Sequence, residues 1–149
     1  MKKRQIRVLI GNIEPNFDHM LSAIIRRRLG TKYEISFMSV GTGDRLLRLA
    51  EEHPFDIFIL IPNNILFRRK GLNIKDRDRK VLEIIAHLAP AHGKPMMAIS
   101  AFWTKDTSFA KKARLAGMNS YLDIPFKPKE FLEPLSRLLE IEPDDGQSC

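Results

Sequence analysis

Catalysis and metal binding need particular side chains at particular spacings, and the 149-residue chain offers few of them. Its four histidines show no metal-type spacing with acidic residues or with the one cysteine: His19, His53, His87 and His92. The segment from Gly41 to Gly43 lacks the further glycine and the lysine of a phosphate-binding loop, and no serine lies in a nucleophile-elbow sequence. The sequence therefore predicts a protein that is not an enzyme, with no catalytic residue, no metal site and no cofactor.

The hydrophobic pattern alternates between short strand-like runs and longer stretches with helical spacing. Apolar or alternating runs predict strands near residues 6–10, 33–37, 55–61, 95–99 and 120–123. Apolar residues recur every three or four positions between them, which predicts helices around residues 17–29, 44–50, 81–88, 107–116 and 128–139. Thr42 or Asp44 is the expected cap of the second helix, and Gly117 is suited to end the fourth.

The character of each predicted strand indicates its place in a sheet. Strands that alternate with helices favour an α/β fold, in which a single doubly wound parallel sheet carries helices on both faces. The first, third and fourth strands are almost continuously apolar, as central strands are. The second alternates and the fifth is short, so both are expected at edges. The flavodoxin-like order 2-1-3-4-5 satisfies these conditions, and it places a ligand site beyond the carboxyl ends of the first and third strands.

Several short motifs in and beside the predicted strands occur in a characteristic order. They are Arg7–Ile10 with Glu14-Pro15, Phe55–Leu60, Lys94-Pro95 with Ser100-Ala101, Ala116–Met118, and Tyr121-Leu122 before Pro125-Phe126. Through these motifs, from about Gln5 to Glu140, the chain resembles a response-regulator receiver domain of two-component signalling, of the chemotaxis-regulator type. The resemblance implies a receiver-like domain over residues 1–141, followed by a flexible tail over residues 142–149. Members of this family catalyse their own phosphorylation on an aspartate, with Mg²⁺ held by acidic residues after the first strand.

The resemblance implies that the metal-binding and phospho-accepting positions have lost their chemistry here. The family's acidic pair falls on Asn12 and Ile13, with Glu14 remaining beside it. The phospho-accepting aspartate falls on Ile61. Mg²⁺ requires hard oxygen ligands, usually carboxylates, whereas Asn12 offers one neutral oxygen and the isoleucines offer none. Ile61 also has no nucleophile that could accept a phosphoryl group.

The phosphate-binding side of the same pocket is also changed. The family's lysine after the fifth strand falls on Ile124, which has no charge to offset that of a phosphate, whereas the hydroxyl position after the fourth strand is kept as Ser100. Asp56 lies at the wrong end of its strand, and Asp123 has no acidic partner in the sequence. The resemblance therefore predicts a degenerate pseudo-receiver that lacks the phosphorelay chemistry of its family.

The resemblance also points to a partner surface and to one backbone feature. Ser100 and Tyr121 match the hydroxyl and aromatic positions that are coupled in the family's switch, although Tyr121 is equally well explained as a half-buried aromatic on an edge strand. Phe102 and Trp103 either add to a contact surface, where Trp is common, or fold inward over the pocket. Receiver domains usually have a cis bond before the proline that matches Pro125, so a cis bond is expected here.

The net charge of +7 raises the question of an acidic partner. Basic residues cluster at positions 2–4, 26–28, 68–70 and 111–112. No aromatic residues are interleaved with them, as a platform that stacks single-stranded nucleic acid would need. Solvated surface charge is therefore favoured over nucleic-acid binding, and nucleic acid remains a less favoured partner.

One predicted connection, from Pro62 to Asp78, is longer than most loops in compact domains. It contains the basic residues Arg68, Arg69 and Lys70. Because it follows the changed acceptor position, it could cover the crevice or reach a partner.

These expectations together describe a receiver-like signalling domain that acts by protein–protein contact without aspartyl phosphorylation. The expected partner is another signalling protein or an output domain, with a homodimer as a further possibility. Two alternatives stay open: a basic module that binds nucleic acid or an acidic surface, and a phospho-receiver with an unrecognised acceptor. No apolar run approaches membrane-spanning length, so a cytoplasmic protein without membrane contact is expected. A single cysteine, Cys149, excludes an intramolecular disulfide.

Overall fold

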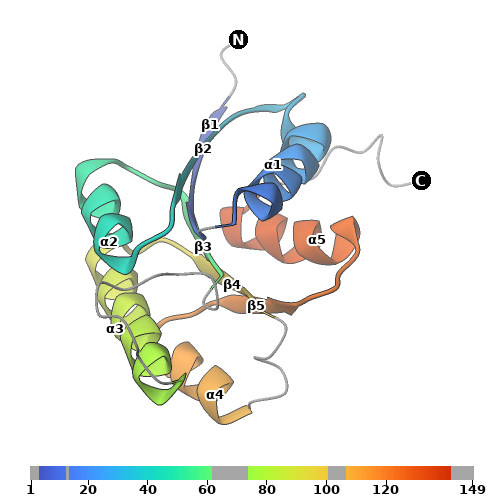
Figure 1. The fold of residues 1–149 in the computed structure, drawn as a ribbon. Coiled ribbons are helices and arrows are strands. Elements are labelled where there is room, and N and C mark those ends of the chain that lie inside the picture. Colours follow the sequence, from blue (N-terminus) through green and yellow to red (C-terminus); the bar gives the residue numbers. More distant parts are fainter. Residues whose placement is uncertain (1–3, 13, 62–73, 101–106, 142–149) are drawn as a thin grey trace.

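The chain forms a parallel β-sheet that is covered by helices on both faces (Figure 1). The computed structural model describes residues 4–12, 14–61, 74–100 and 107–141, and the predicted tail over residues 142–149 lies outside these ranges. In chain order the elements are β1 Arg4–Gly11, α1 Pro15–Leu29, β2 Tyr33–Val40, α2 Gly43–Glu52, β3 Ile57–Leu60, α3 Ile74–His92, β4 Met96–Ser100, α4 Thr107–Ala116, β5 Ser120–Asp123 and α5 Pro128–Leu139. The predicted alternation of strands and helices is confirmed.

The sheet has the predicted strand order, β2-β1-β3-β4-β5, and every neighbouring pair is parallel. All residues of β3 are buried, as expected of a central strand, whereas β2 alternates between exposed and half-buried residues along most of its length. In the register of the sheet, Gly11 of β1 lies beside Val40 of β2 and Leu60 of β3. The carboxyl ends of these three strands therefore meet at one edge of the sheet.

The helices divide the core into two apolar layers. Helices α1 and α5 cover one face of the sheet, and α2, α3 and α4 cover the other (Figure 1). Leu21 of α1 and Phe131 of α5 are fully buried in the first layer, and Leu46 of α2, Ile85 of α3 and Ala113 of α4 are fully buried in the second. Burying a large apolar side chain contributes about 1.5–3 kcal/mol each, so these two layers supply most of the force that holds the helices to the sheet.

Two helix starts are fixed by capping side chains. Helix α1 begins at Pro15, earlier than the expected start near residue 17, because proline suits the first helical position and the Glu14 carboxylate accepts a hydrogen bond from the Asn16 backbone N–H at 3.0 Å. Helix α2 is capped by Thr42, one of the two expected residues, whose hydroxyl oxygen accepts from the Arg45 N–H at 3.4 Å.

Within the described residues, no helix is both long and apolar enough to cross a lipid bilayer.

The end of α4 packs closely against α3. Gly117 follows α4 with a φ of 127°, a conformation that favours glycine, as its predicted role at the helix end requires. A Cβ atom at Gly117 would lie 2.2 Å from the Cβ of Ala89 on α3. The absence of a side chain at this position therefore allows the two helices to approach each other.

Candidate functional site

The candidate site is the carboxyl edge of the sheet, where β1 and β3 end. Asn12 directly follows β1, and its backbone N–H donates to the Val40 carbonyl of β2 at 2.9 Å. Ile61 directly follows β3, and its N–H donates to the Gly11 carbonyl at 2.9 Å. A Cβ atom on Gly11 would lie 3.1 Å from the Leu60 side chain, so the strands pack tightly here. The sheet thus brings Asn12 and Ile61 to the same edge.

The buried side chain of Asn12 is the centre of a polar network that joins three elements. Its side chain is only 3% exposed, and its Nδ2 donates to the Glu14 carbonyl at 2.6 Å and to Asp18 Oδ1 at 2.7 Å. The Ser39 hydroxyl of β2 donates to the other oxygen, Asp18 Oδ2, at 2.5 Å. Both carboxylate oxygens of Asp18 therefore accept hydrogen bonds from within the chain, and these bonds tie α1 to the ends of β1 and β2.

The sequence pattern does not mark Asp18 and Ser39 as site residues. A faint signal was present, because Asp18 lies in the first turn of the helix that follows Asn12. Ser39 gives no signal of its own, since a serine near the end of an edge strand is usually solvated. Only the packing of α1 beside β2 reveals that the two residues share a hydrogen bond.

The residues at this edge do not fit a magnesium ion. Asn12 Oδ1 is buried and has no hydrogen-bond partner, but it is one neutral oxygen, whereas Mg²⁺ is usually held by carboxylates in octahedral geometry. The exposed Glu14 carboxylate caps α1, and the Asp18 carboxylate is occupied by Asn12 and Ser39. In the described ranges, no group of three or more histidine, cysteine, aspartate or glutamate residues could hold a metal ion.

Ile61 occupies the position at the end of β3. Its side chain is 2% exposed and belongs to the apolar cluster beneath α1 and α5, together with Ile59 of β3 and Ile99 of β4. A hydrocarbon side chain has neither a nucleophilic oxygen nor a metal-binding lone pair. This position therefore contributes packing and no phosphoryl chemistry of its own.

Two further positions are Ile124, which follows β5, and Asp56, which precedes β3. The Ile124 side chain is 38% exposed, and the Ile124–Pro125 bond is cis, the isomer that the resemblance to receiver domains implies. Asp56 lies just before β3, at the opposite end of the strand from Ile61, where its Oδ2 accepts from the Arg7 backbone N–H at 2.8 Å. Asp56 thus stabilises the start of the sheet and is remote from the candidate site.

Of the remaining predicted positions, Ser100 and Tyr121 lie within the described residues. Those outside the described residues are Ile13, Arg68, Arg69, Lys70, Phe102 and Trp103. Ser100 ends β4, where it lies beside Asp123 of β5 in the register of the sheet. Tyr121 of β5 is half-buried against the layer beneath α2, α3 and α4, and the guanidinium carbon of Arg114 lies 5.0 Å from the centroid of its ring. This distance is typical of a cation–π contact.

Comparison with known proteins identifies the fold. No protein-family model and no curated protein sequence matches the chain. Solved structures do match it: the receiver domain of a sensor histidine kinase from Pseudomonas aeruginosa, with magnesium coordinated in its active-site cleft, has a TM-score of 0.62 and 23% identity, and the match covers 91% of this chain and 98% of that one. The chemotaxis response regulator CheY4 of Vibrio cholerae gives a TM-score of 0.64 at 17% identity, with 90% and 98% covered.

A third match places the same fold within a longer protein. NtrX from Brucella abortus gives a TM-score of 0.67 at 17% identity, and the match covers 90% of this chain but 26% of that one. At these identities the likeness establishes the fold. The chain has the flavodoxin-like receiver fold, with the strand order and the helical layers described above.

The Asn12–Asp18 hydrogen bond can be tested by a change of charge. We expect Asn12→Asp to lower the free energy of unfolding by about 2–3 kcal/mol at pH 7, because it removes the donor and places a second carboxylate against Asp18. The double variant Asn12→Asp/Asp18→Asn exchanges donor and acceptor and should recover at least half of the loss. Urea unfolding measures both. Equal stability of wild type and Asn12→Asp at pH 7 would contradict the hydrogen bond described here.

Proposed function

We propose that this chain is a signalling module of the receiver fold that works by protein–protein contact, without aspartyl phosphorylation and without enzymatic activity. The observation that carries the proposal is the buried Ile61 at the end of β3, where a receiver needs a carboxylate to accept the phosphoryl group. The neutral side chain of Asn12 and the commitment of Asp18 to internal hydrogen bonds support the same conclusion.

The surface we propose for the contact is formed by α4 and β5. Leu115 on α4 is 89% exposed, which is unusual for a large apolar side chain in a solvated surface, and it adjoins Arg114 and its contact with Tyr121. Tyr and Arg are the residue types that contribute most to binding energy at protein interfaces. The partner would be another signalling protein or an output domain, as the longer NtrX chain illustrates for a related fold.

The test is a direct search for phosphorylation. The protein would be incubated with acetyl phosphate and Mg²⁺, and then titrated with beryllium fluoride while its amide NMR spectrum is recorded. We expect no acid-labile phosphate and no shifts at Asn12, Ile61 and Ser100. A receiver of known activity under the same conditions is the control. Saturable shifts at these three amides, or acid-labile phosphate on any residue, would overturn the proposal and favour an active phospho-receiver.

The distribution of charge argues against nucleic-acid binding as the main function. Two basic clusters fall within the described helices, at residues 26–28 of α1 and 111–112 of α4. These helices lie on opposite faces of the sheet (Figure 1), so the two clusters do not form one continuous basic surface. Binding to DNA or RNA with a steep dependence on salt concentration would favour the nucleic-acid alternative instead.

A further inference from the structure

The outer edge of β2 carries backbone groups that the sheet does not use. In the described chain, β2 lies at the end of the sheet and pairs with β1 alone. The Val40 carbonyl accepts from the Asn12 N–H, so the backbone of Val40 faces β1. Because the N–H and C=O groups of successive residues point in opposite directions along a strand, every second residue before Val40 also faces β1. The residues between them direct their N–H and C=O groups away from the sheet: Tyr33, Ile35, Phe37 and Ser39.

This edge has few of the features that prevent a strand from pairing with another chain. Strand β2 is 8 residues long, among the longest in the sheet, and it contains no proline. Its register with β1 runs without interruption from Arg4 and Tyr33 to Gly11 and Val40, so no bulge turns the edge aside. Glu34 is its one charged residue. A long, regular edge of this kind is a ready template for an additional strand.

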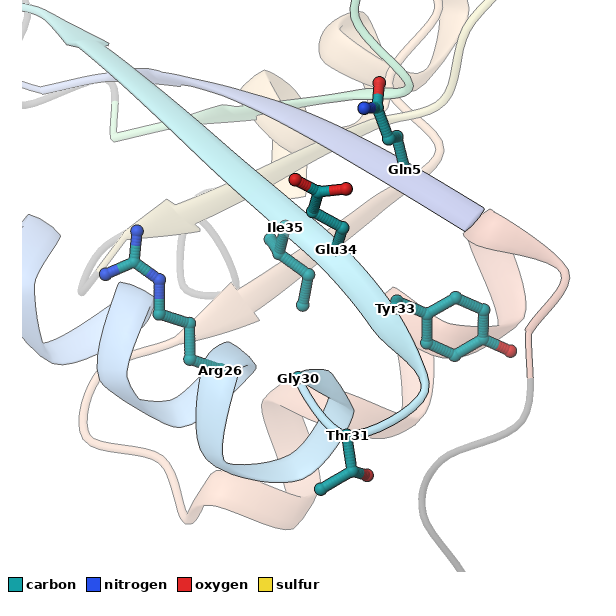
Figure 2. A pocket seen from close by; sticks show the side chains of 7 residues that line it. All are labelled: Gln5, Arg26, Gly30, Thr31, Tyr33, Glu34 and Ile35. Atoms are coloured by element: carbon teal, nitrogen blue, oxygen red, sulfur yellow. The ribbon is translucent and has the colours of Figure 1, made fainter. Parts of the chain in front are cut away.

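Two hollows follow the same strand. The first has a volume of about 860 Å³ and lies where the end of α1 meets the start of β2 (Figure 2); its lining residues are Gln5, Arg26, Gly30, Thr31, Tyr33, Glu34 and Ile35. The second, of about 410 Å³, is lined by Ser36, Phe37 and Met38 of β2 together with Arg7 of β1 and His53 beyond α2. The hollows together accompany β2 from residue 33 to residue 38. Along this strand Glu34, Ser36, Met38 and Ser39 are exposed.

The charges beside the edge favour an acidic occupant. Arg26 lines the first hollow, with its guanidinium carbon 4.9 Å from the centroid of the Phe37 ring, and Arg27 and Arg28 follow it in the last turn of α1. The exposed Arg7 lines the second hollow. A second copy of the chain is a poorer occupant, since pairing two β2 edges would bring together two chains that each carry a net charge of +7.

We propose that the outer edge of β2 is a docking site for an extended, acidic segment of a partner protein, which pairs with β2 as an additional strand. The backbone groups of Ile35 and Phe37 would bond the segment, Arg26 would pair with its acidic side chains on the α1 face of the sheet, and the exposed Met38 would contact an apolar side chain on the other face. This site is independent of the proposed function, because β2 lies at the opposite edge of the sheet from β5.

A synthetic heptapeptide of alternating valine and glutamate, blocked at both ends, is the probe. Amide hydrogen exchange of the whole chain would be followed by NMR with and without it. We expect the exchange of the Ile35 and Phe37 amides to slow by about fivefold or more at saturation, whereas the Ser36 and Met38 amides, already bonded to β1, should change little. N-methylation of the peptide's pairing amides should abolish binding, and lysine in place of glutamate should weaken it about tenfold or more.

Ile35→Pro removes one outward N–H and places a ring on the edge, without removing a hydrogen bond to β1. We expect it to abolish peptide binding, while the matched variant Ile35→Val retains it. If Ile35→Pro does not fold, Arg26→Glu serves instead: it should weaken binding of the glutamate peptide and strengthen binding of the lysine peptide. The proposal is overturned if no binding is detected, if the N-methylated peptide binds equally well, or if Ile35→Pro abolishes self-association of the chain, which would assign the edge to a second copy.

Discussion

Replacing Ile61 by aspartate should lower the free energy of unfolding by about 3–5 kcal/mol at pH 7, and the variant should remain unphosphorylated. The first expectation follows from burial: the side chain is 2% exposed within an apolar cluster, and a charge placed there has no partner. The second follows from the neighbouring Asn12, which cannot replace a metal-binding carboxylate. Urea unfolding and a test for acid-labile phosphate would measure the two effects.

Two matched variants separate charge from shape at this position. Ile61→Val removes one methylene and should lower the free energy of unfolding by about 0.5–1.5 kcal/mol. Ile61→Asn introduces a neutral side chain that is nearly isosteric with aspartate. The difference in the free energy of unfolding between Ile61→Asn and Ile61→Asp therefore reports the cost of the charge. That difference should shrink as the pH is lowered, because protonation neutralises the introduced carboxyl group. An Ile61→Asp variant as stable as Ile61→Val would mean that the side chain faces solvent.

Gly117→Ala should lower the free energy of unfolding by about 3 kcal/mol or more. At a φ of 127° an L-residue is strained, and the new methyl group would meet the Ala89 side chain at 2.2 Å. Gly93→Ala is the matched control, since Gly93 also has a positive φ, of 60°, but has no atom within 4 Å of the added carbon. That variant should cost about 1–2 kcal/mol, from the left-handed backbone alone.

A double variant tests the steric part of this effect. Ala89→Gly removes the methyl group that Gly117→Ala would strike, so the double variant should be more stable than the sum of the two single effects predicts, by about 1–2 kcal/mol. Simple additivity would show that α3 and α4 do not approach each other at this point. Thermal and urea unfolding of all four proteins would complete the cycle.

The order of the strands could be predicted from sequence because burial leaves a direct mark on residue type. The continuous apolar run of β3 and the alternation of β2 follow from a position at the centre and at the edge of the sheet. The same reasoning predicts that Asn12 and Ile61 lie at one edge of the sheet, because the carboxyl ends of parallel strands meet there. Helix α1 was expected to begin later than Pro15, because apolar spacing marks the buried face of a helix and not its first turn.

The hydrogen bonds among Asn12, Asp18 and Ser39 could not be predicted in the same way. Asp18 and Ser39 are 21 positions apart and meet only because α1 packs beside the end of β2. Polar residues leave no periodic pattern when they pair across elements, and an aspartate in the first turn of a helix is already explained by the helix dipole. The position of Asp18 in the first turn of α1 therefore gives no sign of its hydrogen bonds to Asn12 and Ser39.

The occupied carboxylate of Asp18 has a consequence for how a signal could be controlled. Its two oxygens accept hydrogen bonds from the Asn12 N–H and the Ser39 O–H, so the negative charge of Asp18 is stabilised by the chain itself. Under the proposed function, the module then requires neither ATP-derived phosphate nor a divalent ion to reach its binding form. Occupancy of the partner would follow mass action, and the cell would adjust the output by changing how much of the protein it synthesises and degrades.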